Sequence, residues 1–217
     1  MIKREDFPVL DFLDKNFSGK QISYLEVGAG LGKFIDTIKC NPAFDNFSIT
    51  ALEINSKLCQ SLKMKRIKVI NRDILNSKLK INEFDVVHCS HVIEHFGYPQ
   101  ITAVLDELFS VLKRGGYLVI RTPAMHKGFY NDIDHIRPYP PASIMNYFQN
   151  IQQQKLGSFR MKNIFSFDRY DSFRLSSYLK INNSASALID ALIKFSWSIF
   201  DFPRGPVTGY IMCFQKL

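Results

Sequence analysis

The chain has 217 residues, of which 46 % are hydrophobic and 22 % are charged. These proportions are typical of a globular protein and exclude an intrinsically disordered one, so we expect a single domain over residues 1–217. The formal net charge of +8 is compatible with nucleic acid, an anionic membrane surface or an acidic substrate as partner, and equally with a solvated basic surface.

The sequence also bears on location. The N-terminus lacks the apolar core of a signal peptide, and no apolar stretch approaches the ~18 residues of a membrane span. We therefore expect a cytoplasmic protein without a membrane span. The cysteines are scattered and form no C-x-x-C pair, which indicates buried free thiols. They are Cys40, Cys59, Cys89 and Cys213.

From Ile22 onward, short apolar runs alternate with helical patterns, which predicts repeated β–α units and a mostly parallel sheet. A helix is expected after the first strand, with Asn41-Pro42 ending it. The expected strands of this part are residues 22–27, 47–52, 67–70, 84–89 and 117–120.

The clearest helical pattern precedes the fifth strand. Apolar residues recur with helical spacing from Ile101 to Leu112, and Gly115-Gly116 is expected to stop this helix in a left-handed conformation. A loop of about fifteen residues follows Pro123, long enough to suggest a functional role. Beyond it we expect a helix at 141–150, a strand at 160–167, a helix at 184–200 packed in the core, and a last strand at 209–214.

A glycine-rich turn, Gly28-Ala29-Gly30-Leu31-Gly32, follows the first strand. Parallel sheets bind nucleotide-like ligands at such turns, because glycine permits positive φ and a close approach of the backbone. The NAD fingerprint needs a glycine where this chain has Lys33, and the P-loop needs one where it has Val27. Neither of these two motifs fits.

The turn resembles motif I of the class I S-adenosylmethionine-dependent methyltransferases, [DE]-x-G-x-G-x-G. The later strand ends and the Leu112–Leu118 passage with its glycine pair also resemble that family, in the expected order over about residues 22–122. The resemblance implies S-adenosylmethionine as cofactor, with Glu53 accepting hydrogen bonds from the ribose hydroxyls and Asp73 lying near the adenine. The implied cofactor-binding residues are Glu26, Gly28, Gly30, Gly32, Glu53, Asp73, Ile74 and Ser90.

The same resemblance implies an α/β fold. It is a Rossmann-like, seven-stranded, mostly parallel sheet with helices on both faces and the last strand antiparallel. Residues of about 22–122 would form the cofactor-binding half and residues of about 123–217 the acceptor side. The oligomeric state is left open.

The methyl acceptor has a weaker signature. After the fourth strand the chain lacks the [DN]-P-P-[FY] segment of base N-methyltransferases, and no cysteine follows a proline as in pyrimidine C5-methyltransferases. His91–Phe96 resembles the x-E-H segment of the broad small-molecule methyltransferases. The loop segment 132–139 adds a D-x-H-x-R-x-Y pattern in which His135 is the expected general base, with Asp132 or Asp134 fixing its tautomer.

These patterns favour methyl transfer to a small-molecule or glycan acceptor, at oxygen, with His135 and then His91 as catalytic residues. Arg137 and Tyr139 are expected to position the acceptor, or else the loop is a buried polar hinge. We expect no metal at the site. One alternative is a metal-assisted RNA 2′-O-methyltransferase, for which Glu94, His95 and a later histidine resemble part of a metal-binding segment. Another is a cofactor-binding protein without catalysis.

Nucleic acid is a possible but not favoured partner, because the basic residues between the second and fourth strands have no interleaved aromatic residues. They are Lys57, Lys63, Lys65, Arg66, Lys68, Arg72, Lys78 and Lys80.

Overall fold

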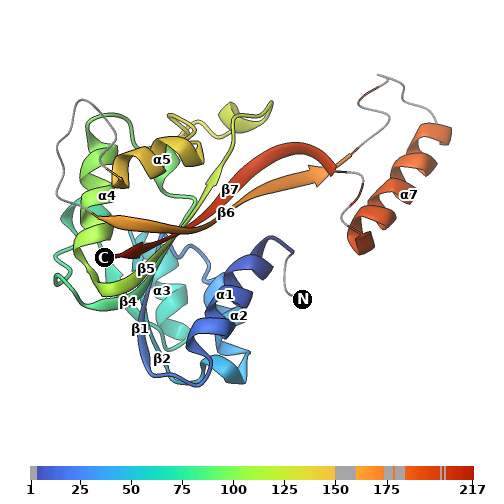
Figure 1. Cartoon of the computed structure of the whole chain (residues 1–217). Helices are drawn as coiled ribbons and strands as arrows, with labels where there is room; N and C mark the ends of the chain where they lie inside the picture. The colour runs from blue at the N-terminus through green and yellow to red at the C-terminus, as the bar shows by residue number, and fades with distance from the viewer. Residues whose placement is uncertain (1–3, 150–159, 174–177, 179–183, 201, 203) are drawn as a thin grey trace.

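The computed structural model describes residues 4–149, 160–173, 178, 184–200, 202 and 204–217. Within them, seven strands form one sheet in the order β3-β2-β1-β4-β5-β7-β6 (Figure 1). The strands are β1 (Ile22–Val27), β2 (Phe47–Glu53), β3 (Lys68–Asn71), β4 (Phe84–Ser90), β5 (Leu112–Pro123), β6 (Met161–Ser172) and β7 (Arg204–Lys216). The first five run parallel, whereas β7 pairs antiparallel with both β5 and β6. The predicted Rossmann-like sheet with an antiparallel last strand is confirmed.

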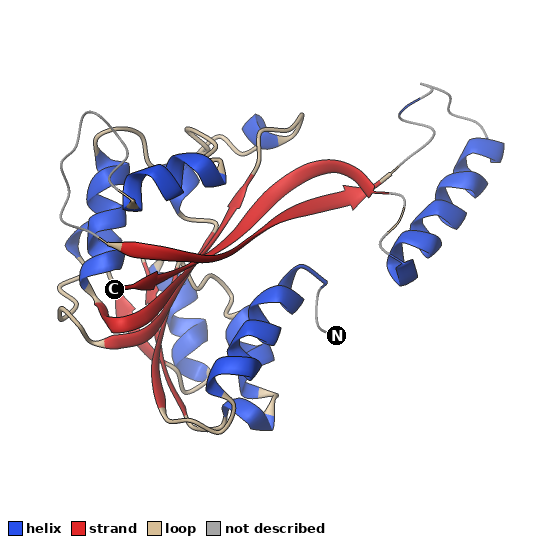
Figure 2. Cartoon of the chain, viewed as in Figure 1, coloured by secondary structure: helices blue, strands red, loops and turns tan. Residues whose placement is uncertain are grey.

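Helices cover both faces of this sheet (Figure 2). The α-helices are α1 (Phe7–Phe17), α2 (Lys33–Lys39), α3 (Ser56–Met64), α4 (Gln100–Ser110), α5 (Pro141–Phe148) and α7 (Ser184–Phe200). Alternate residues of the central strands point to opposite faces. Val86 and Val119 thus pack with α1 and α2, and Val87 and Leu118 pack with α4 and α5. The carboxyl ends of the parallel strands therefore lie between two helical layers.

The glycine pair before the fifth strand has a different role from the one predicted. Helix α4 already ends at Ser110, and Gly115 and Gly116 lie inside β5, so the predicted helix stop was wrong. Gly115 has φ +78°, next to the point where the register between β4 and β5 shifts. A Cβ on Gly116 would lie 3.0 Å from the carbonyl oxygen of Asp85. The glycines therefore permit a bulge and a close strand pairing.

Helix α7 spans the predicted residues 184–200, but its surroundings differ from the prediction. It stands at the far end of the long β6–β7 hairpin, away from the sheet (Figure 1). Leu188, Leu192 and Phe195 are 65 %, 61 % and 65 % exposed, so the prediction that this helix packs in the core was wrong. No helix among the described residues has both the length and the apolar character to cross a membrane. Of the four free cysteines, Cys40 is exposed rather than buried.

Candidate functional site

The glycine-rich turn begins where β1 ends, and its three predicted glycines all have positive φ: Gly28 (+70°), Gly30 (+54°) and Gly32 (+72°). Two of them also prevent a steric clash. A Cβ on Gly28 would lie 2.3 Å from Cγ2 of Val92, and one on Gly32 would lie 2.6 Å from Cδ2 of Leu62. A Cβ on Gly30 would meet no heavy atom within 4 Å. The turn is therefore packed at both ends and open in its middle, as a cradle for a ligand requires.

Glu53, the last residue of β2, is buried and binds the middle of this turn. Its Oε2 accepts a hydrogen bond of 2.8 Å from the Gly30 amide, and its Oε1 accepts one of 2.8 Å from the Asn55 amide. Each carboxylate oxygen has a second lone pair that can accept a further donor. Glu53 therefore fixes the turn and can still meet hydroxyl groups at its edge.

Asp73 and Ile74 follow β3, at the third strand end that the sequence selected. The Asp73 carboxylate caps the short 3-10 helix η3 (Ile74–Asn76) by accepting a hydrogen bond of 2.8 Å from the Leu75 amide. The Ile74 side chain is only 5 % exposed and packs in the core under α4. The Ile74 side chain therefore does not face a ligand.

A buried polar network lies under the turn and holds Glu26, the penultimate residue of β1. Oε2 of Glu26 accepts a hydrogen bond of 2.8 Å from the Tyr24 hydroxyl and lies 2.9 Å from Nδ1 of His88. Burial, with the Glu26 carboxylate nearby, raises the pKa of Tyr24 well above its usual value, so the phenol stays a donor. Both contacts use Oε2, which leaves Oε1 as the oxygen that can meet a ligand.

Glu26 lines a pocket of about 360 Å³ at the carboxyl ends of β1, β4 and β5. Ligands of parallel α/β sheets bind at this end of the strands. Gly28, Ser90 and His91 line the same pocket, so it joins the glycine turn to the segment after β4. Its other lining residues are Glu5, Asp6, Ala29, Leu31, Lys33, Phe34 and Arg121.

His91, which lines this pocket, is held from two sides. Its backbone has φ +56°, a rare value for a residue other than glycine and one that is enriched at functional sites. Nε2 lies 3.1 Å from Nη1 of Arg169, and Nδ1 lies 3.2 Å from Oε1 of the fully buried Glu94. Because a guanidinium can only donate, Nε2 of His91 accepts and Nδ1 carries the proton.

The charged groups on the N-terminal side of the pocket were not predicted from the sequence. Arg121 at the end of β5 forms an ion pair of 2.6 Å with Asp6 and one of 3.6 Å with Glu5, which also lies 3.1 Å from Arg169. The sequence does carry a signal for Arg121, a single charge directly after the apolar run Leu118-Val119-Ile120. The sequence carries no such signal for Arg169. Burial lowers the pKa of this arginine.

The loop after β5 lies beside the pocket rather than across it. His135 is not among the described residues that line the pocket. Its Nδ1 lies 2.7 Å from the Phe129 carbonyl oxygen, and Asp132 faces the other nitrogen at 3.7 Å. The tautomer of His135 is thus fixed by a backbone carbonyl, not by Asp132 or Asp134 as predicted.

Two further predictions concerned the same loop. Tyr139 is 6 % exposed, packs in the core and donates a hydrogen bond of 2.6 Å to the Phe96 carbonyl oxygen. The prediction that Tyr139 positions the acceptor was therefore wrong. Arg137 is exposed and lies over the Tyr139 ring.

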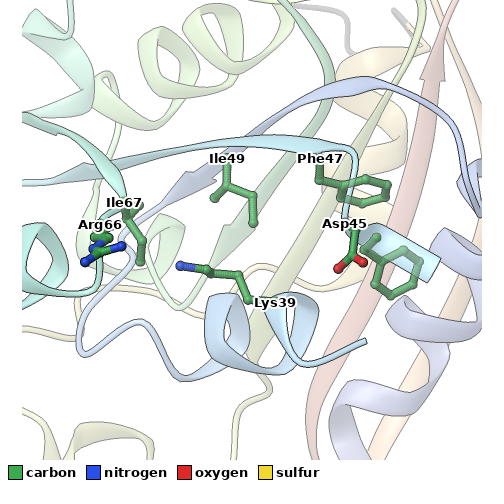
Figure 3. Close-up of a pocket in the computed structure, with 7 residues that line it drawn as sticks. Lys39, Asp45, Phe47, Ile49, Arg66 and Ile67 are labelled. Atoms are coloured by element: carbon green, nitrogen blue, oxygen red, sulfur yellow. The ribbon is translucent and has the colours of Figure 1, made fainter. Parts of the chain in front are cut away.

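A second hollow, of about 190 Å³, lies at the opposite, amino-terminal end of the sheet (Figure 3). Lys39, Asp45 and Arg66 line it together with apolar residues at the start of β2. Lys39 already donates a hydrogen bond of 2.9 Å to the Lys65 carbonyl oxygen. None of the predicted site residues lies in this hollow, so we place the functional site at the glycine turn.

The residues at the turn fit the cofactor that the resemblance implies. The space beside Gly30 would be filled by a Cβ, and carboxylates stand at the ends of β1 and β2. His88 Nε2 and Arg121 Nε are buried next to the site without a hydrogen-bond partner among the described residues. Carboxylates favour an amino group, a sulfonium and ribose hydroxyls over phosphates.

Known proteins that are similar to this chain include methyltransferases. Residues 25–120 match the family model of a methyltransferase domain. An uncharacterized protein from Methanocaldococcus jannaschii is 31 % identical over 115 residues, which are 52 % of this chain and 47 % of that protein. The S-adenosyl-L-methionine-dependent methyl transferase PigF from Serratia sp. is 23 % identical over 116 residues, 51 % of this chain and 33 % of PigF. The matched segments thus span less than half the length of these curated relatives.

A solved structure resembles the chain over nearly its whole length. The S-adenosylmethionine-dependent methyltransferase from Archaeoglobus fulgidus superposes with a TM-score of 0.63, covering 99 % of this chain and 95 % of that one, at 21 % identity. At this level of identity, the likeness establishes a shared fold.

Proposed function

We propose that this chain transfers a methyl group to an oxygen of a small-molecule or sugar acceptor. The chain belongs to the class I S-adenosylmethionine-dependent methyltransferases and uses S-adenosylmethionine as cofactor. The observation that carries the proposal is the 360 Å³ pocket, which joins Glu26 and Gly28 to Ser90 and His91. A donor site and a candidate proton acceptor thus share one cavity.

S-adenosylmethionine, when bound, supplies a methyl group on a positively charged sulfonium that is open to in-line attack. Glu26 would hold its amino group with the oxygen that Tyr24 and His88 leave free. Glu53 would accept hydrogen bonds from the ribose hydroxyls while it keeps the Gly30 amide. Asp73, the Ile74 backbone and Ser90 complete the proposed cofactor-binding set, with Gly28 and Gly32 shaping the turn.

His91 is our first candidate for the group that takes the acceptor proton. Its Nδ1–H faces Glu94, which would stabilise an imidazolium, and its Nε2 faces the guanidinium of Arg169. An acceptor hydroxyl that displaces Arg169 from Nε2 would find a proton acceptor held in a fixed orientation. His135 is the second candidate, because it is not among the described residues that line the pocket.

The charges around the pocket favour a small acceptor over RNA. Glu5 and Asp6 line the pocket and pair with Arg121, so this arginine is already occupied and does not offer a free cation to a phosphate backbone. The basic stretch of residues 57–80 belongs to α3, β3 and η3, at the β3 edge of the sheet, whereas His91 follows the central strand β4. An RNA-modifying enzyme would bring a basic surface and the catalytic histidine together. In this chain the basic stretch and His91 therefore lie at different places on the sheet.

One observation supports the RNA alternative, namely that Glu94, His95 and His135 lie close enough together to hold a metal ion. The alternative of a cofactor-binding protein without catalysis has support in the Arg169 contact, which occupies Nε2 of His91. The first alternative predicts methyl transfer to RNA, and the second predicts cofactor binding without methyl transfer.

The test is methyl transfer from methyl-labelled S-adenosylmethionine to two separate pools, one of hydroxylated small molecules and sugars and one of short RNAs. We expect label in the first pool and release of S-adenosylhomocysteine. Label in RNA alone, lost as salt concentration rises, would replace our proposal with RNA modification. Tight cofactor binding with only slow hydrolysis in both pools would indicate a binding protein.

A further inference from the structure

Three side chains with metal-ligating atoms lie next to the pocket, outside the residues that line it. Glu94 and His95 belong to the 3-10 helix η4 (Ile93–His95) after β4, and His135 belongs to the loop after β5. One ligand atom from each lies within 4.8 Å of the other two. Glu94 is fully buried, whereas the two imidazoles are partly exposed. The group therefore places a buried carboxylate behind two histidines that solvent can reach.

Both histidines have a fixed tautomer. Nδ1 of His95 lies 3.1 Å from the Asp134 carbonyl oxygen, and Nδ1 of His135 lies 2.7 Å from the Phe129 carbonyl oxygen. A carbonyl oxygen only accepts, so both Nδ1 atoms carry the proton and both neutral rings keep a lone pair on Nε2. Metal-bound histidines commonly have this arrangement, in which a backbone carbonyl orients the ligating nitrogen.

We propose that Glu94, His95 and His135 bind one divalent transition-metal ion. Two imidazoles and a carboxylate suit Zn²⁺, Mn²⁺ or Fe²⁺, whereas Mg²⁺ prefers oxygen ligands throughout. Oδ2 of Asp132 lies 3.7 Å from Nε2 of His135 and offers a fourth ligand. Tetrahedral ligands at about 2.1 Å from a metal stand roughly 3.4 Å apart, so modest side-chain rotations complete the site.

This ion would connect the loop to the pocket. Oε1 of Glu94 lies 3.2 Å from His91, and its Oε2 accepts a hydrogen bond of 3.3 Å from Thr122 at the end of β5. A bound cation would fix the carboxylate that orients His91 and would hold the loop against η4. The proposed metal site would act through positioning, and it differs from the metal-free site expected from the sequence. Metal binding is measured without an acceptor, so it can succeed or fail independently of the proposed reaction.

The experiment is a titration of the full chain after dialysis against a chelator, with Zn²⁺ by calorimetry and with Co²⁺ by visible absorption. We expect one equivalent of each ion and, for Co²⁺, the bands of a four-coordinate site. In His95→Asn and His135→Asn the amide nitrogen can still donate to the backbone carbonyl, but Nε2 is lost. Each should weaken binding by about 100-fold or more, because even outer-shell partners of a metal are worth about 10–100-fold.

His126→Asn is the matched control. His126 is in the same loop but outside the cluster, and its Nδ1 accepts a hydrogen bond of 3.0 Å from the Gly128 amide. Its affinity for Zn²⁺ should match the parent. The proposal is overturned if the parent binds no more tightly than the His95→Asn/His135→Asn double variant, or if His126→Asn loses as much affinity. A lower melting temperature of the metal-free Asn variants with unchanged Zn²⁺ affinity would also overturn it, since the histidines would then only pin the loop.

Discussion

Helices α4 and α7 carry apolar residues at helical spacing in the sequence, yet their surroundings are opposite. In α4 the stripe packs against one face of the sheet: Ile101, Val104, Leu105 and Leu108 are at most 6 % exposed. In α7 the corresponding residues face outward, and Phe200 is 73 % exposed. The apolar stripe predicts the helix in both cases, but it does not identify what covers the apolar face.

The connection that each helix makes explains the difference. α4 joins two adjacent parallel strands, β4 and β5, and such a crossover must return across the face of the sheet. α7 joins β6 and β7, an antiparallel pair whose far ends extend beyond the sheet (Figure 1). The same contrast separates the parallel strands β1, β4 and β5, whose carboxyl ends meet at one pocket, from the β6–β7 hairpin, whose far end extends beyond the sheet.

The largest effect should come from His91, which lines the pocket. His91→Asn keeps a residue that tolerates positive φ and can still donate to Glu94, but it lacks Nε2. We expect normal folding and cofactor affinity, with methyl transfer about 10²–10⁴-fold slower. Single-turnover rates on the identified acceptor measure this. His135→Asn, measured in parallel, shows whether the loop histidine has the larger share, and full activity of His91→Asn would remove it as the base.

The next largest effect concerns the buried stripe of α4. Leu108→Ala removes a fully buried side chain, so we expect a loss of about 2–5 kcal/mol in the free energy of unfolding. Urea denaturation measures it. A loss below about 1 kcal/mol would mean that α4 is not packed as described.

On the cofactor side, Glu53→Ala removes the acceptor proposed for the ribose hydroxyls and the partner of the Gly30 amide. A charged hydrogen bond is worth about 1.5–3 kcal/mol, which predicts about 10–150-fold weaker binding of S-adenosylmethionine and S-adenosylhomocysteine alike. Isothermal titration calorimetry decides, with Asp73→Ala as a comparison from the next strand end. Unchanged affinity of the Glu53 variant would exclude Glu53 from the site.

The smallest effect should be at α7. Leu192 is 61 % exposed, so Leu192→Ala should change the free energy of unfolding by no more than about 0.5 kcal/mol. This variant is the exposed counterpart of Leu108→Ala, and the same denaturation experiment serves both. Equal losses for the two leucines would show that α7 is covered in the folded chain.

The cofactor side of the fold could be predicted because its signals are local. Glycines that need positive φ and acids that end strands mark positions along the chain, and parallel strands bring those positions to one edge. The site around His91 depends instead on distant pairs. Arg169 comes from β6 and Glu5 from the N-terminal segment, and no spacing in the sequence links either residue to His91.

The loop after β5 was predicted in part. Its histidine does lie near Glu94 and His95, but Tyr139 enters the core and a carbonyl rather than Asp132 orients His135. Backbone carbonyls leave no mark in a sequence, because every residue has one. The exposure of α7 could not be predicted for a similar reason, since it depends on where a hairpin ends in space.

The cofactor site is tested most directly by calorimetric titration of S-adenosylhomocysteine into the parent chain, Gly30→Val and Gly19→Val. Gly30 and Gly19 both have positive φ, and neither would have a heavy atom within 4 Å of an added Cβ, so the two variants carry similar backbone strain. Only Gly30 lies at the proposed cofactor site. We expect one equivalent bound at micromolar affinity by the parent and by Gly19→Val, and no measurable binding by Gly30→Val. Normal binding by Gly30→Val, or none by the parent, would contradict this expectation.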